Sequence, residues 1–141
     1  ASGSGSGGAA LSRRKYGETL EVINRRFPHW FAANFRKYNE REEELPLDQH
    51  MLPGLITPRE VYYSSAREDR WADPIGEYLG LSLASRVFAE IYGKESVFEQ
   101  EFDDLKGPVH LESVSYHIRE GKHDLTWEDW RIFLEFVVEN L

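Results

Sequence analysis

The sequence predicts an α/β fold with an incomplete sheet. Two short runs of β-branched and aromatic residues, at 61–63 and 113–118, each lead toward a charged loop, which is typical of strands that deliver polar side chains to a sheet edge. Segments with apolar residues at helical spacing precede, separate and follow these runs. The resulting order is helix, helix, strand, helix, strand, helix, which indicates layers of helix against sheet but supplies too few strands for a whole sheet.

Composition favours one globular domain and argues against two classes of partner. The 141 residues include four Trp, seven Tyr and eight Phe, enough for a hydrophobic core. A net charge of −8 opposes binding to nucleic acid or to an anionic membrane, so a neutral or locally recognised ligand is favoured. No apolar run could span a bilayer, the start lacks the regions of a signal peptide, and the absence of Cys excludes disulfides and a thiol nucleophile.

The N-terminal part divides into a Gly/Ser-rich start and two predicted helices. Residues 1–10 are interpreted as a linker, although Gly-rich turns also occur where backbone passes close to an active site. Apolar spacing predicts a helix over 16–26 and a second one from Pro28, whose aromatic stripe is interpreted as core. The acidic run 40–44 is interpreted as a solvated tail rather than a cation site, because adjacent acids diverge around a helix.

The strand predicted at Val61, Tyr62 and Tyr63 is the centre of the predicted site, and residues 64–66 are expected to let the chain leave the sheet. Pro58 can only precede such a strand, and the acids Glu68, Asp69 and Asp73 follow its C-terminal end. Ligands bind at that edge in open α/β sheets, so these acids have a catalytic interpretation beside the simpler one of a solvated turn.

A long helix is predicted after this loop, with Asp73 as its cap, Pro74 at its first position and Gly93 at its end. It should cover one face of the sheet. The stretch GLSLA around Ser82 superficially resembles the nucleophile elbow G-x-S-x-G. An elbow needs a sharp turn between strand and helix, so Ser82, which falls inside a helical period, is rejected as a nucleophile.

Three histidines receive different interpretations. His123 follows the second strand and a Gly turn, in a loop where a catalytic side chain could be presented. His117 lies within the strand itself and is expected to be structural, and His50 is interpreted as a buried, hydrogen-bonded side chain. After the loop, Thr126 can begin a final helix in a capping box with Asp129.

Asp69 and His123 stand in the chain order in which α/β-hydrolases place the acid and the histidine of a Ser…Asp…His triad. Five longer motifs accompany them: SGSGGAA at 4–10, FPHWF at 27–31, LPLDQHMLPGLITPR at 45–59, EDRWADP at 68–74 and GKHDLTWEDW at 121–130. Together, in one order over nearly the whole chain, they resemble the C-terminal half of the glucuronoyl esterases, the 4-O-methyl-glucuronoyl methylesterases.

The resemblance implies a fold and a substrate. Residues 1–141 would be the C-terminal part of a single α/β-hydrolase domain, a three-layer α/β/α sandwich whose sheet is here incomplete. Enzymes of this family cleave the ester that joins 4-O-methyl-glucuronic acid of glucuronoxylan to lignin alcohols, a reaction of lignocellulose degradation that needs neither cofactor nor metal. By the same resemblance the protein is expected to be secreted or periplasmic.

The resemblance also implies roles for four residues. His123 would be the general base of a serine esterase and Asp69 the acid that supports it. Trp71 would form a wall of the sugar pocket, and Glu18 would contact the uronate hydroxyls. These roles fit the side chains, because an indole face suits the C–H side of a sugar and a carboxylate accepts hydrogen bonds from hydroxyls.

Two departures from the family bear on activity. The nucleophilic serine and the oxyanion hole of the family lie upstream of the region this chain resembles, so the chain is expected to be inactive alone and to need the N-terminal half as its partner. The family also has Glu where this chain has Gly3, which places more weight on Asp69. Three hypotheses stay open: half of an esterase of this specificity, half of a related hydrolase acting on another carbohydrate ester such as an acetyl ester, and a non-catalytic binding module.

Overall fold

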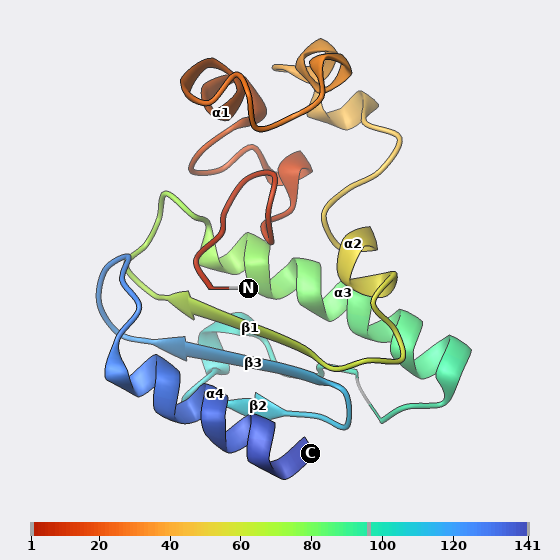
Figure 1. Ribbon diagram of the computed structural model, residues 1–141, viewed down its shortest axis with the longest axis vertical. Helices are drawn as coiled ribbons and strands as arrows, with labels where there is room; N and C mark the ends of the chain where they lie inside the picture. Colours follow the sequence, from red (N-terminus) through yellow and green to blue (C-terminus); the bar gives the residue numbers. More distant parts are fainter. Residues whose placement is uncertain (1, 96, 141) are drawn as a thin grey trace.

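The structure is a computed structural model that describes residues 2–95 and 97–140. A long N-terminal part built mainly of turns and short helices precedes the sheet (Figure 1). The helices are α1 (Leu20–Arg26), α2 (Met51–Gly54), α3 (Pro74–Tyr92) and α4 (Trp127–Asn140), and the strands are β1 (Val61–Ala66), β2 (Val109–His110) and β3 (Val114–Arg119). Short 3-10 helices are η1 (Ser12–Arg14), η2 (Ala33–Tyr38), η3 (Glu42–Glu44) and η4 (Phe102–Asp104).

The strands form one sheet in the order β1-β3-β2. β1 and β3 are parallel, and their register runs from Val61 opposite Val114 to Ala66 opposite Arg119, whereas β2 pairs antiparallel with β3. α3 lies in the connection between the two parallel strands, as a crossover requires. The C-terminal ends of β1 and β3 therefore lie side by side, where both arrowheads point in Figure 1.

Helices cover both faces of the sheet. Tyr63 and Tyr116, which are partners in the register, belong to the core formed with Phe88 of α3. Tyr62 points to the other face and meets Phe136 of α4, with ring centroids 5.2 Å apart. This alternation produces the predicted order of helix, sheet and helix, seen as α3 behind and α4 in front of the strands (Figure 1).

The Gly/Ser-rich start is part of the fold, so the linker interpretation is wrong. Ser2 forms a parallel bridge with Ser64, and the Gly3 N–H donates to Ser64 O at 3.0 Å. The segment thus runs along the edge of β1 that faces away from β3. It continues against α3, where a Cβ added to Gly80 would lie only 2.7 Å from Ala9 O. Gly80 of α3 allows this close approach. The Gly/Ser-rich composition of the segment itself does not distinguish a docked segment from a flexible linker.

The prediction of an α-helix beginning at Pro28 is also wrong. α1 forms, although it begins only at Leu20, and the chain beyond it makes turns and the 3-10 helix η2, which contains no buried residue. The aromatic stripe is therefore not core. Its rings pair locally instead, with Phe27 stacked on Trp30 at a centroid distance of 4.0 Å. Local stacking of this kind removes ring surface from water without a continuous helix.

The burial or hydrogen bonding of three polar side chains differs from what the sequence predicted. Glu42, expected to be solvated, is 1% exposed and lies 3.3 Å from the Lys15 ammonium. Asp73 precedes α3 but makes no capping hydrogen bond, because its carboxylate pairs with Arg14 at 2.7 Å. His50 is half-buried, and its Nδ1 has no hydrogen-bond partner among residues 2–95 and 97–140. The first two differences come from cations distant in the sequence, which local patterns do not reveal.

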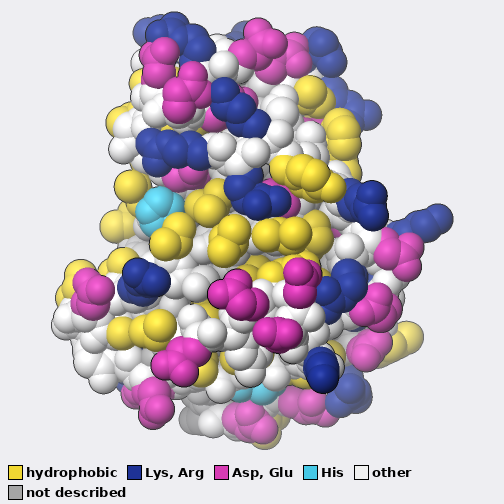
Figure 2. All heavy atoms as spheres, turned by 180° about the vertical axis from the view of Figure 1, so that it is seen from behind, with side chains coloured by type: hydrophobic (Ala, Val, Ile, Leu, Met, Phe, Trp, Pro, Cys, Tyr) yellow, Lys and Arg dark blue, Asp and Glu magenta, His cyan; other side chains and the backbone are white. Residues whose placement is uncertain are grey.

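The surface behind the view of Figure 1 mixes charge types. Figure 2 shows acidic and basic side chains interspersed there, with a band of apolar side chains between the upper and lower parts. Exposed apolar side chains on α2 and α3 include Met51, Leu52, Ile75, Leu79 and Leu83. No helix within the described residues is both long and apolar enough to cross a membrane.

Candidate active site

The C-terminal ends of β1 and β3 bring Asp69 and His123 into contact. The parallel hydrogen-bond pattern continues past the strands, where the Glu68 N–H donates to Gly121 O at 3.0 Å and holds the two loops side by side. His123 Nδ1 lies 2.6 Å from Asp69 Oδ2, although 54 positions separate the residues in the sequence. The contact expected from chain order is present.

The Asp69 carboxylate orients the His123 ring. An ionised carboxylate only accepts hydrogen bonds, so Nδ1 carries the hydrogen and Nε2 is left as an acceptor. The Asp69 side chain is 7% exposed and that of His123 is 71% exposed. The Ala72 N–H donates to the second oxygen of Asp69 at 3.2 Å. A buried acid thus holds an accessible imidazole that can take a proton from a hydroxyl group.

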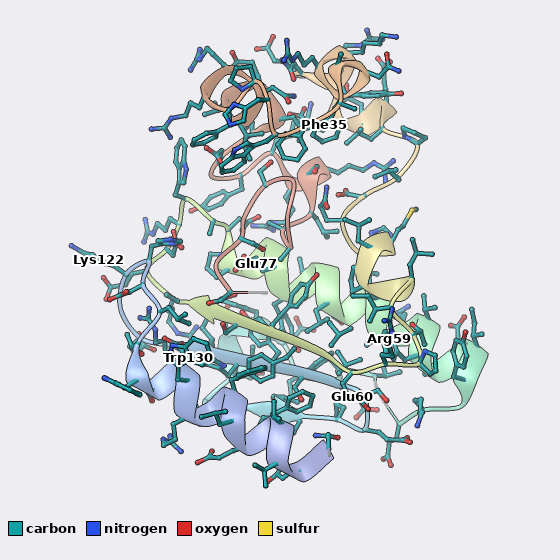
Figure 3. The ribbon with its side chains drawn as sticks, in the orientation of Figure 1. Phe35, Arg59, Glu60, Glu77, Lys122 and Trp130 are labelled. Carbon is teal, nitrogen blue, oxygen red and sulfur yellow. The ribbon has the colours of Figure 1, made fainter. Side chains whose placement is uncertain are left out.

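Arg119, at the end of β3, fixes the loop that carries His123. Its guanidinium donates to three loop carbonyls, Glu120 O at 2.9 Å, Lys122 O at 3.0 Å and Asp124 O at 2.7 Å. Lys122 itself lies on the outer side of this loop (Figure 3). The rigid, planar donor fork of arginine suits this task, because one side chain serves several acceptors at once. Arg119 is a positioning residue that the sequence interpretation missed.

Asp129 holds Arg119 and ties the loop to α4. Its carboxylate accepts hydrogen bonds from Arg119 Nε and from the Thr126 N–H, at 2.8 and 2.7 Å, and the Asp129 N–H donates weakly to Thr126 Oγ1 at 3.4 Å. The predicted capping box is confirmed. Burial would raise the pKa of Asp129, but the hydrogen bonds from Thr126, His117 and Arg119 outweigh it and lower that pKa to about 2. Asp129 is therefore ionised at neutral pH.

His117 lies inside β3, as predicted, and is wholly buried. Its Nε2 is 2.8 Å from Asp129 Oδ1, and its Nδ1 meets the Tyr62 hydroxyl. Burial lowers the pKa of His117, against the opposing effect of Asp129. Both ring nitrogens are engaged, so this histidine joins β1, β3 and α4 and has no nitrogen left for a substrate.

Gly3 lies against the Asp69–His123 pair. Its backbone has φ 49°, and a Cβ added there would lie 3.3 Å from His123 Nδ1 and 3.5 Å from Asp69 Oδ2. A longer side chain in place of Gly3 would therefore start beside the imidazole and the Asp69 carboxylate.

A pocket of about 250 Å³ opens beside the pair. It is lined by Ser2, Gly3, Ala66, Asp69, His123, Asp124 and Leu125. Two of the four predicted site residues, Asp69 and His123, thus share one pocket. The other two, Glu18 and Trp71, are not among the described residues that line it.

Glu18 and Trp71 lie together in a second cluster. The Glu18 N–H donates to Trp71 O at 2.9 Å, and this approach requires Gly17, at which a Cβ would lie 2.3 Å from the same oxygen. Arg26 joins them, with its guanidinium carbon 5.5 Å from the centroid of the half-exposed indole and one nitrogen 3.8 Å from Glu18 Oε1. Trp71 follows Asp69 by two positions, so this cluster continues the same loop.

Two serines near the sheet, Ser65 and Ser82, are placed away from His123. Ser65 donates its hydroxyl to Glu77 at 2.5 Å, and Ser82 lies inside α3, as the rejection of an elbow required. Within the part of the chain that the structure describes, no group of three or more His, Asp or Glu side chains is placed to hold a metal ion. The site consists of an oriented histidine, its acid and a nearby aromatic cluster.

Known proteins with similar sequences are esterases. Residues 1–93 match a family model described as "Glucuronyl esterase, fungi". Over 133 residues the chain is 47% identical to carbohydrate esterase MZ0003 of an unknown prokaryotic organism, a match that covers 94% of this chain and 30% of that protein. Over 57 residues it is 35% identical to a 4-O-methyl-glucuronoyl methylesterase of Podospora anserina, covering 40% of this chain and 12% of that one.

Solved structures give the same result over nearly the whole chain. A promiscuous CE15 esterase from a marine bacterial metagenome superimposes with a TM-score of 0.93 at 44% identity, covering 99% of this chain and 35% of that one. A glucuronoyl esterase from Solibacter usitatus gives a TM-score of 0.88 at 50% identity, with the same coverage of 99% and 35%. The chain spans about a third of the length of these relatives.

Proposed function

The chain belongs to the glucuronoyl esterase family, and we propose that it is the C-terminal part of a serine esterase acting on esters of 4-O-methyl-glucuronic acid in glucuronoxylan with lignin alcohols. Its fold is the C-terminal portion of an α/β-hydrolase. The observation that carries the proposal is the 2.6 Å contact between His123 Nδ1 and Asp69 Oδ2 at adjacent strand ends.

In the proposed reaction, His123 Nε2 accepts the proton of a serine hydroxyl as that oxygen attacks the ester carbonyl. The serine comes from the part of the relatives that this chain does not span. The imidazolium then gives the proton to the departing alcohol, and a water molecule hydrolyses the acyl-enzyme by the same route. Asp69 keeps the hydrogen on Nδ1 and stabilises the imidazolium, so the base stays in the useful tautomer.

The cluster of Trp71 and Glu18 is proposed to bind the sugar. An indole face packs against the apolar side of a sugar ring, and a carboxylate accepts hydrogen bonds from its hydroxyls. The Arg26 guanidinium carbon lies 5.5 Å from the centroid of the Trp71 ring. A sugar that stacks on that face therefore has to displace the guanidinium, which can then pair more closely with Glu18, 3.8 Å away.

The proposed partner is the N-terminal part of the hydrolase domain, in the same polypeptide or supplied separately. Beyond Ser2, the β1 edge lacks a further paired strand within the described residues. A groove of about 220 Å³ at this edge is lined by Ser2, Tyr62, Ser64, Leu125, Asp129, Trp130 and Phe133. An apolar stripe on α4 continues from it through Trp127, Trp130, Leu134 and Val138, which are 45–90% exposed. Relatives about three times as long have the chain length to cover this surface.

A second candidate is an esterase for another carbohydrate ester, such as an acetyl ester. The solved relative described as promiscuous favours it, because the same base and acid serve any ester that fits beside them. A non-catalytic binding module is the weakest of the three hypotheses, since binding alone would not require an accessible imidazole held by a buried acid. The expected secreted or periplasmic location stays a prediction.

The proposal is tested by completing the domain. The 141-residue chain would be mixed with, or joined to, the N-terminal two-thirds of the MZ0003 relative and given a benzyl ester of glucuronic acid. We expect hydrolysis by the combination and none above background by either part alone, because the serine of the family lies upstream of the region that this chain resembles. Acetylated sugar offered in parallel separates the two esterase candidates.

Two outcomes would contradict the proposal. Turnover by the chain alone that disappears on His123→Ala would show that the N-terminal part is not needed. Stable co-elution of the two parts without hydrolysis of either ester would show that the completed domain is not an esterase of these classes.

A further inference from the structure

Glu77 is a buried carboxylate that the proposed reaction does not use. It lies in the first turn of α3 and is 1% exposed. Its side chain lies between α3 and the N-terminal segment (Figure 3). Burial raises the pKa of Glu77 to about 6, although hydrogen bonds from Ser65, Gly5 and Ser4 oppose that effect. A buried carboxyl group is costly unless such donors surround it, so its partners indicate its role.

Those partners belong to two different parts of the chain. Glu77 Oε1 accepts the Gly5 N–H at 3.0 Å, across 72 positions of sequence. Oε2 accepts the Ser65 hydroxyl at 2.5 Å. Ser65 follows Ser64 in β1, and Ser64 O is the acceptor of the Gly3 N–H. One carboxylate therefore connects α3 and β1 to the Gly-rich segment.

Gly5 makes the hydrogen bonds that close the Gly-rich segment into a turn. Its carbonyl accepts the N–H groups of Gly8 and Ala10, both at 3.1 Å, which closes the segment into a compact turn. Its own φ is 53°, and a Cβ there would lie 3.1 Å from Ala72 Cα, in the loop of Asp69. Two positions earlier, Gly3 backbone lies against the His123 ring.

We propose that Glu77 is a positioning residue for the Asp69–His123 pair, which it serves by docking residues 2–8 onto the sheet edge so that Gly3 closes one side of the imidazole. The inference rests on the proposed function only in assigning catalysis to that pair. Loss of the carboxylate leaves Gly5 and Ser65 without their acceptor, the segment moves away from the edge, and the His123–Asp69 hydrogen bond is opened to water.

The test is nuclear magnetic resonance on the isotopically labelled chain at one fixed pH, with two local readouts. The first is the hydrogen-exchange rate of the Gly5 amide, and the second is the hydrogen-bonded Nδ1 proton signal of His123. In Glu77→Ala we expect Gly5 exchange to accelerate at least about tenfold and the His123 signal to be lost, while amides of Leu81 and Phe88 in α3 stay within about twofold. A merely structural role would change all of these amides together.

Two further variants complete the experiment. Glu77→Gln keeps the shape but replaces a charge-assisted acceptor by a weaker neutral one, so a several-fold acceleration at Gly5 is expected even where Glu77→Ala fails to fold. Glu90→Gln, an exposed acid on the same helix, should match the parent. Unchanged Gly5 exchange and an unchanged His123 signal in the folded Glu77 variants, or equal acceleration throughout α3, would overturn the inference. Neither readout involves turnover, so failure here is distinct from failure of the proposed esterase activity.

Discussion

His117 and His123 lie six positions apart and each contacts an aspartate, His117 at 2.8 Å from Asp129 and His123 at 2.6 Å from Asp69. Their surroundings are opposite, because the side chain of His117 is 1% exposed and that of His123 is 71% exposed. His117 also meets the Tyr62 hydroxyl, which engages its second nitrogen. An aspartate–histidine contact alone is therefore not evidence of a base. The accessible second nitrogen distinguishes the candidate catalytic residue from the structural one.

The largest expected effect is the loss of the base. In the completed domain, His123→Ala should lower kcat by about 10⁴-fold or more, because the serine hydroxyl is a weak nucleophile without it. His117→Gln, the matched histidine control, should keep kcat within roughly tenfold of the parent while lowering stability. Steady-state kinetics with the benzyl glucuronate ester measure both. If His117→Gln abolished activity and His123→Ala left it intact, the assignment of the base to His123 would be wrong.

Asp69→Asn should have the next largest effect. The amide can donate to Nδ1 and favour the wrong tautomer of His123, so kcat should fall by a factor on the order of 10² to 10⁴. The variant should fold and bind substrate, which a competitive uronic acid ligand can check. Activity equal to that of the parent would mean that another acid supports His123.

Asp129→Asn tests the structural role of Asp129, which contacts the buried His117 and Arg119. It removes the charge opposite Arg119, and breaking such a buried pair costs about 3 kcal/mol or more of unfolding free energy. The lowered pKa of Asp129, about 2, means that this stabilisation is present above about pH 4 and is lost as the pH falls from 4 to 2. Urea unfolding between these pH values measures it, with Glu128→Gln as the exposed neighbour control. A parent whose stability does not change in this range would contradict the assignment.

Glu77 should give the opposite dependence on pH. Its pKa is raised from 4.5 to about 6, so the folded state holds the proton more tightly and the unfolding free energy falls as the pH rises from about 4.5 to 6. The expected loss is about 2 kcal/mol. Asp69, Tyr63 and Tyr116 are the titratable groups that interact with it, and the tyrosines stay neutral in this range. Glu77→Gln should remove the slope. If the unfolding free energy of this variant still falls over the same pH range, a group other than Glu77 causes the dependence.

The smallest expected effect concerns sugar binding. In the completed domain, Trp71→Ala should raise KM about tenfold with kcat less affected, because the ring would contact the sugar in the ground and transition states alike. Glu18→Gln should do the same more weakly. A fall in kcat without a change in KM would instead connect this cluster to the Asp69 loop and thus to the base.

The sequence was sufficient to predict the two parallel strands and the pair at their ends. The run predicted at 113–118 matches β3 to within a residue, whereas β1 continues through Ser64, Ser65 and Ala66, which were expected to leave the sheet. Parallel neighbours necessarily present their C-terminal loops together. The roles of Trp71 and Glu18 came from the family resemblance, and the structure brings these two residues into contact without testing what they bind.

The parts that were not predicted depend on long-range contacts. The Gly-rich start is ordered by Ser64 and Glu77, which are distant in sequence, so its composition suggested a linker. The position of Arg119 could have been inferred from the sequence. It lies two positions after His117 in a strand, so both side chains point to the same face, where Asp129 contacts them. Its three carbonyl partners in the loop became evident only from the structure.

The register of β1 against β3 also determines which genetic changes the site can tolerate. Asp69 lies three positions after Ala66, and His123 lies four positions after its register partner Arg119. Each inserted or deleted strand residue would displace one loop by about 3.3 Å and turn the following side chains to the other face. Substitutions within these strands alter the packing only gradually. An insertion or deletion of a single codon would separate Asp69 from His123. Length variation among functional homologues should therefore be confined to segments outside these two strands and their loops.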